Sequence, residues 1–71
     1  MRMLARLRYL LAEGFDVQQV DGTFGSDLAG QASIRYQMPM PDGSLRRYSE
    51  HYYIDRAELE ACHRVATLRQ G

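Results

Sequence analysis

Two pairs of neighbouring side chains have the residue types that nucleophilic catalysis uses. Ser49 and His51 lie two residues apart, and Cys62 stands directly before His63. A nucleophile of this kind needs a histidine within hydrogen-bond reach and a third group that orients the ring. Residues two apart on a strand are about 7 Å apart, and adjacent helical residues point about 100° apart. No orienting acid is evident, so we expect that the protein is not an enzyme.

Metal and cofactor chemistry is not favoured either. Two histidines and one cysteine are the soft ligands, and they lack the paired spacing of a zinc site. The stretch DGTFGSDLAG, residues 21–30, has neither the spacing of a calcium loop nor the lysine of a phosphate-binding loop. Cys62 falls on the apolar side of its predicted helix, where it reads as an unreactive core residue. We therefore expect no metal and no cofactor.

Arginine and tyrosine are the residue types that stand out. All nine basic residues are arginines, and residues 45–53, LRRYSEHYY, hold two of them together with three tyrosines. These types are enriched at the energetic centres of protein interfaces. Arginine contributes a planar fork of hydrogen-bond donors that lysine lacks. A GC-rich genome, which favours arginine codons, is the competing explanation.

The length and composition of the chain limit the class of protein to which it can belong. Its 71 residues predict a single domain, 1–71, and its hydrophobic fraction of 45% is that of a globular protein. A lone cysteine cannot form an intrachain disulfide and suits a reducing compartment. There is no apolar run long enough for a membrane span and no signal-peptide pattern. We expect a cytoplasmic protein without a membrane partner.

The periodicity predicts two helices and three strands. Apolar residues at helical spacing predict a helix over 1–13, ended by Gly14. A first strand is expected from Phe15 to Val20, followed by a loop over 21–30 in which a helical turn could begin at Ser26. Asp55 is expected to start the last helix, because Asp55 and Glu58 resemble a capping box.

A hairpin turn at Pro41-Asp42-Gly43 fixes the register of the other two strands. Proline presets the first turn dihedral and glycine takes the positive φ, so Met40 faces Ser44 and Tyr36 faces Tyr48. The packed face is then even-numbered, with Ile34, Tyr36, Met38, Met40, Tyr48, Tyr52 and Ile54. The other face is odd-numbered, with Ser33, Arg35, Gln37, Leu45, Arg47, Ser49, His51 and Tyr53.

These elements predict an α+β domain of order α-β-β-β-α. Its core would be a three-stranded antiparallel meander with both helices packed on the even-numbered face. The odd-numbered face stays open, and its predicted partner-binding residues are Arg35, Leu45, Arg47, His51 and Tyr53. Four other surfaces stay open as alternatives: the hairpin tip with its methionines, a basic strip of Arg2, Arg6 and Arg8, the strand edges, and an acidic patch of Asp16, Asp21, Asp27 and Asp42 that could meet a basic groove.

The predicted element order resembles that of the double-stranded-RNA-binding domain. That family carries a lysine-rich motif at the start of its last helix, whereas residues 55–60 here read DRAELE. Phosphate binding draws its energy from clustered cations, and this chain has zero net charge. Nucleic-acid binding is therefore the alternative function, with bases stacked on the open face.

The expected function is that of a small, non-enzymatic protein-binding module. Its partner would be a larger protein or complex, and the module would inhibit or regulate it by covering a surface. Inhibitors encoded by phages and mobile elements, including anti-CRISPR proteins, share this build. A second copy of the chain is a further expected partner, because one small core gives limited stability.

Overall fold

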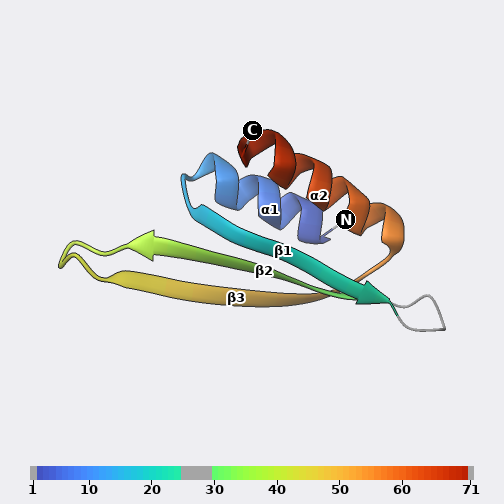
Figure 1. Cartoon of the computed structure of the whole chain (residues 1–71), viewed down its shortest axis with the longest axis horizontal. Coiled ribbons are helices and arrows are strands. Elements are labelled where there is room, and N and C mark those ends of the chain that lie inside the picture. The colour runs from blue at the N-terminus through green and yellow to red at the C-terminus, as the bar shows by residue number, and fades with distance from the viewer. Residues whose placement is uncertain (1, 25–29, 71) are drawn as a thin grey trace.

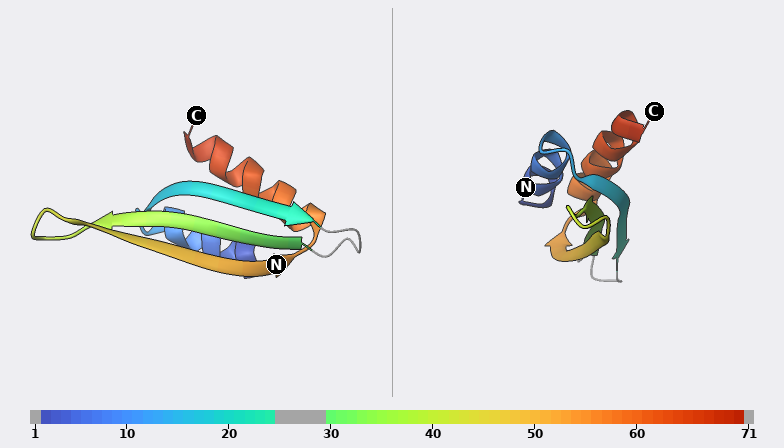
Figure 2. Two further views of the ribbon diagram at one scale, coloured as in Figure 1. Left: turned by 60° about the horizontal axis from the view of Figure 1, so that its bottom comes forward. Right: turned by 90° about the vertical axis from the view of Figure 1, so that its left-hand side faces the viewer.

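The computed structural model describes residues 2–24 and 30–70 and has the predicted α+β architecture (Figure 1). The elements are α1 (Arg2–Ala12), β1 (Asp16–Phe24), β2 (Gly30–Pro39), β3 (Leu45–Ile54) and α2 (Arg56–Gln70). The strands form one antiparallel sheet of order β1-β2-β3, and both helices lie on one side of it (Figure 2). The molecule measures 45 × 20 × 18 Å, and the β2–β3 hairpin extends beyond the helices (Figure 1).

Helix α1 ends at Ala12, and Gly14 is the residue that stops it, as predicted. Gly14 has a φ of 87°, a conformation that glycine adopts without steric cost. Its N–H donates to the carbonyl of Leu11 at 3.2 Å, and the N–H of Phe15 donates to the carbonyl of Leu10 at 3.0 Å. These are the two hydrogen bonds of a Schellman motif. They turn the chain from the helix directly into β1.

A β-bulge in β1 explains the change in its apolar pattern from odd to even positions. Val17 pairs with Tyr36 and Gln19 pairs with Arg35, so the register shifts around Gln18. The extra residue moves the following side chains to the opposite parity. Val17 before the bulge and Val20 after it therefore both pack into the core.

The loop predicted over residues 21–30 was wrong at both of its ends. Strand β1 continues to Phe24 and β2 already begins at Gly30, whereas the turn expected at Ser26 lies outside the described residues. Gly22 allows β1 to lie close to α2, because an added Cβ would stand 2.6 Å from a methyl of Leu59. Gly22 therefore lies within a strand and permits close packing there, whereas the composition of residues 21–30 predicted a loop.

The hairpin turn and its register are those predicted. Gly43 has a φ of 88°, and its N–H donates to the carbonyl of Met40 at 2.9 Å. Met40 in turn donates to the carbonyl of Ser44 at 2.7 Å. Asp42 accepts hydrogen bonds from the N–H and the hydroxyl of Ser44. Tyr36 consequently lies opposite Tyr48.

The core is small and lies between the helices and the sheet. Its largest fully buried side chains are Met3, Leu7, Leu10, Ile34 and Cys62. Burial, together with the nearby charge of Glu58, raises the pKa of the Cys62 thiol to about 11. The cysteine is therefore an interior residue, as expected, and holds its proton at neutral pH.

Glu58 joins the two helices in a way that the predicted capping box does not describe. Asp55 caps α2 as expected, accepting a hydrogen bond from the N–H of Glu58 at 2.8 Å. The carboxylate of Glu58, however, accepts from the N–H groups of Met3 at 2.9 Å and Leu4 at 3.2 Å. It thus caps α1, whose first turn carries no acid of its own.

Replacing Glu58 by alanine is expected to lower the free energy of unfolding by about 1–2 kcal/mol, because two amides of α1 lose their acceptor. Urea unfolding followed by circular dichroism measures this loss. Glu60→Ala is the matched control, since Glu60 is an exposed acid on the same helix and its loss should cost less than about 0.5 kcal/mol. Equal losses in the two variants would contradict the capping role.

Candidate interaction surface

The five predicted binding residues lie together on the face of the sheet that the helices leave uncovered. We call this surface, which carries the odd-numbered residues of β2 and β3, the open face. Arg35, Arg47 and His51 are exposed on it. Leu45 is 52% exposed at the start of β3, and Tyr53 is 85% exposed near its end. The parity fixed at the hairpin turn therefore gathers these side chains on one surface.

The strand register arranges the open face in rows across the sheet. Asp16, Gln37 and Arg47 form one row, and Gln19, Arg35 and Ser49 form the next. Two further rows run from Asp21 through Ser33 to His51, and from Thr23 through Gln31 to Tyr53. In the first and third rows an acid on β1 stands at one edge and a basic residue on β3 at the other.

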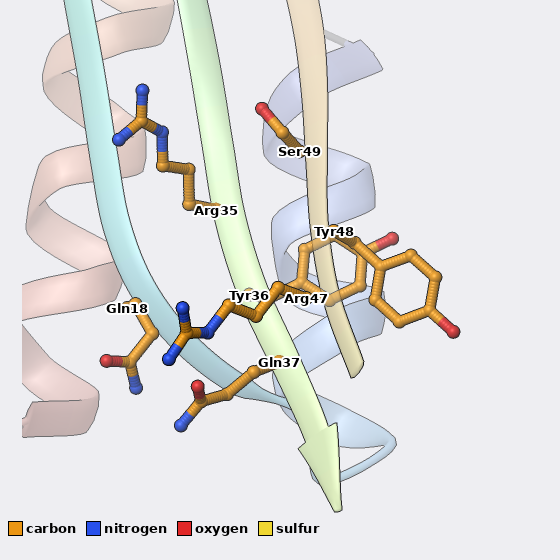
Figure 3. Close-up of a pocket in the computed structure, with 7 residues that line it drawn as sticks. All are labelled: Gln18, Arg35, Tyr36, Gln37, Arg47, Tyr48 and Ser49. Atoms are coloured by element: carbon orange, nitrogen blue, oxygen red, sulfur yellow. The ribbon is translucent and has the colours of Figure 1, made fainter. Parts of the chain in front are cut away.

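An open depression of about 380 Å³ lies at the first two of these rows (Figure 3). It is lined by Gln18, Arg35, Tyr36, Gln37, Arg47, Tyr48 and Ser49. Figure 3 shows the side chain of Arg47 extending across β2 toward Gln18 and Gln37, whereas that of Arg35 points away from both glutamines. The depression therefore offers two guanidinium groups and two side-chain amides, and its lining includes no carboxylate.

The arginines of the open face have no acidic partner among the described residues. Within residues 2–24 and 30–70, the ion pair is formed by Arg6 and Glu50 and does not include Arg35 or Arg47. Both acids of β1 on this face are held by glutamine side chains: Asp16 accepts from Gln37 at 2.8 Å, and Asp21 accepts from Gln19. The donors of Arg35 and Arg47 are thus available to a ligand.

Behind the open face, a carboxylate binds β3 to α1. Glu50 accepts from Arg6 through both oxygens, with Nε at 3.0 and 3.2 Å and a terminal nitrogen at 2.9 Å. The hydroxyls of Tyr36 and Tyr52 donate to the same carboxylate. Four side chains from α1, β2 and β3 therefore form one polar cluster, which we call the Glu50 cluster. Forked arginine–carboxylate pairs of this kind fix orientation.

The Glu50 cluster shifts the pKa values of its members. The hydrogen bonds from Arg6 hold the pKa of Glu50 at about 2, and those from the two tyrosines act in the same direction. Burial, reinforced by the bond to Glu50, raises the pKa of Tyr52 to about 12.

The predicted basic strip on the first helix is wrong for Arg6, because the guanidinium of Arg6 is already paired with the carboxylate of Glu50.

Tyr48 marks the place where the packed face becomes exposed. Its ring stacks on that of Tyr36, with centroids 5.1 Å apart, and Phe15 meets the other tyrosine edge-on. Tyr48 is nevertheless 37% exposed, although its even number predicted a packed position. The hairpin extends beyond the helices (Figure 1), so its packed side is covered less toward the tip. Met38 and Met40, farther along, are half-buried.

The pairs of side chains that suggested catalysis lack, among the described residues, the acid that would orient the histidine ring. Ser49 Oγ lies 3.4 Å from His51 Nε2, closer than the strand spacing predicted, because the two side chains lean together. Among the described residues no carboxylate hydrogen bonds to that histidine. His63 contacts the carbonyl of Val20 at 3.0 Å instead of joining Cys62.

Metal and membrane features are also absent from the described part of the chain. Residues 2–24 and 30–70 contain no group of three histidine, cysteine, aspartate or glutamate side chains that could hold a metal ion. Within the same ranges, no helix combines the length and the apolar character that crossing a bilayer requires.

Sequence reasoning missed the Glu50 cluster. The available signal was an acid at an even-numbered position between apolar neighbours, since a carboxylate on a packed face requires a partner.

No family model, curated protein or solved structure matches the chain.

Proposed function

We propose that this protein is a non-enzymatic binding module that docks its open face on a larger protein and thereby inhibits or regulates it. One observation carries the proposal. Among the described residues, Arg35 and Arg47 have no acidic partner on the uncovered side of the sheet, and the highly exposed ring of Tyr53 lies on the same side near the end of β3. Arginine and tyrosine are the residues that most often dominate the energy of protein interfaces.

The sheet suits this role because it is already ordered. Side chains on a paired strand lose less conformational freedom on binding than those on a flexible loop. Leu45 and Tyr53 supply apolar contact toward the two ends of β3, and Arg47 lies between them with its forked donors. A partner surface with carboxylates near its centre and apolar side chains around them would complement this pattern.

Single-stranded nucleic acid is the second candidate, because Tyr53 could stack on a base and the arginines could bind phosphates. The charges on the open face argue against it. Asp16 and Asp21 lie on the same surface as the two arginines, and the whole chain has zero net charge. Nucleic-acid affinity depends on an excess of cations, which this surface lacks. A protein partner therefore fits better.

Site-specific photo-crosslinking tests the proposal. The photoreactive residue p-benzoylphenylalanine replaces Tyr53 in one variant and Tyr9 in the other, and each is irradiated in the cells that make the protein. Tyr9 is the matched control, since it is a tyrosine 51% exposed on α1. We expect from position 53 a protease-sensitive, nuclease-resistant product heavier than two copies of the 8.2 kDa chain, and none of the same mass from position 9.

Each other outcome has a defined meaning. A nuclease-sensitive product from position 53 would replace the proposal with nucleic-acid binding. A protein product from position 9 alone would move the interface to the helices and contradict docking through the open face. Absence of any product at either position, in cells where the protein is abundant, would also count against a stable macromolecular partner.

A further inference from the structure

The two edges of the sheet differ in their ability to accept another strand. The free edge of β1 is interrupted by the bulge at Gln18, and α2 contacts this strand. A bulge bends its strand and blunts the edge that the strand presents. In contrast, β3 pairs with β2 over ten residues, Leu45–Ile54, without a register shift. β3 is therefore the edge that can be extended.

The hairpin turn determines which backbone groups of β3 point outward. Met40 donates to the carbonyl of Ser44, so these two residues form a hydrogen-bonded pair. Antiparallel pairs alternate between the hydrogen-bonded and non-hydrogen-bonded types, so the even-numbered residues of β3 bond to β2. The N–H and carbonyl groups directed at the free edge belong to Leu45, Arg47, Ser49, His51 and Tyr53.

We propose that two copies of the chain pair through β3 in antiparallel fashion, around a two-fold axis at Ser49. Ser49 is the middle residue of the outward-pointing set. A pairing centred on it therefore satisfies every outward backbone group of the strand, and a shift by two residues leaves some unpaired. The two three-stranded sheets would join into one continuous sheet of twice that size. The inference does not depend on the proposed function.

The side chains of β3 are compatible with this register. Leu45 meets the partner's Tyr53, so the most exposed apolar residues of the strand cover each other. On the other face Arg46 meets the partner's Tyr52, a pairing of a cation with an aromatic ring. The one acid of β3, Glu50, is already bound to Arg6 and faces the partner's Tyr48 rather than another carboxylate. No two arginines stand opposite each other.

The first test is the mass of the chain in solution, measured by light scattering during gel filtration. We expect twice the 8.2 kDa of one chain for the wild type. Ser49→Pro should be monomeric, because proline removes the central outward N–H while leaving the bonds to β2 intact. Ser49→Ala keeps that N–H and should remain dimeric. Circular dichroism establishes that each variant is folded, and a monomeric wild type would overturn the proposal.

Disulfide trapping tests the register without relying on proline. In Ser49→Cys the two introduced thiols would lie on the axis, with Cα atoms about 5.5 Å apart, within the range for a disulfide. In His51→Cys the equivalent atoms would be on the order of 14 Å apart, because each is two residues from the axis. Mild oxidation should give a covalent dimer of S49C and leave H51C monomeric on a denaturing gel.

The buried Cys62 thiol is the same in both proteins and does not distort the comparison. Equal crosslinking of the two variants, or crosslinking of H51C alone, would contradict the register centred on Ser49. A dimeric wild type in which neither variant crosslinks would place the contact elsewhere and overturn the proposal.

Discussion

Replacing Glu50 by alanine is expected to lower the free energy of unfolding by about 2–4 kcal/mol. The substitution leaves the guanidinium of Arg6 without its forked acceptor and removes the acceptor of the Tyr36 and Tyr52 hydroxyls. Because a 71-residue domain has only a few kcal/mol of stability, a loss of this size unfolds much of the population. Urea unfolding monitored by circular dichroism measures it.

The same carboxylate predicts a loss of stability in acid. Its pKa of about 2 in the folded chain lies below the ordinary value of 4.5. A carboxylate with a depressed folded pKa stabilises the fold above its unfolded pKa, and this contribution disappears as the pH falls toward the folded value. Since Glu50 is partly exposed, we expect about 1–2 kcal/mol to be lost between pH 5 and pH 2.

Glu50→Gln separates this contribution from general acid unfolding. The variant cannot titrate at position 50, so its stability should fall less steeply than that of the wild type over the same pH interval. Glu60→Gln, at an exposed acid of α2, should follow the wild-type curve. Parallel curves for the wild type and Glu50→Gln would show that the Glu50 cluster contributes nothing to the pH dependence.

The face of the sheet on which each hairpin residue lies was predictable, because a short-range sequence signal fixes it. Pro41, Asp42 and Gly43 specify the turn, and the turn specifies every pair along β2 and β3. Arg47 and Tyr53 could therefore be placed on the open face from the sequence alone. The two helices followed from apolar periodicity and from Gly14, whose left-handed conformation ends the first of them.

The features that were missed depend on contacts between elements distant in the sequence. The bulge at Gln18 places both Val17 and Val20 on the packed face, and it is defined by the pairing of β1 with β2. Glu58 suggested a local capping box, but its carboxylate meets the start of α1 instead. Arg6 looked solvent-exposed because the carboxylate that binds it lies in a strand formed much later in the chain. Local spacing carries no information on such partners.

The largest effect on function is expected from the double variant Arg47→Ala/Tyr53→Ala. Both side chains are exposed and neither belongs to the Glu50 cluster, so the fold should be retained. Each truncation at an energetic centre of an interface costs about 2 kcal/mol or more. The partner captured by photo-crosslinking should therefore bind the double variant at least about a thousand-fold more weakly.

The matched control is Arg64→Ala/Tyr9→Ala, which removes the same two residue types from exposed positions on α2 and α1. Titration calorimetry of the partner with the wild type and both variants gives the three dissociation constants directly. If the open face is the interface, the control binds within about threefold of the wild type and the Arg47→Ala/Tyr53→Ala protein shows the thousand-fold loss. Wild-type affinity in a folded Arg47→Ala/Tyr53→Ala protein would contradict docking through the open face.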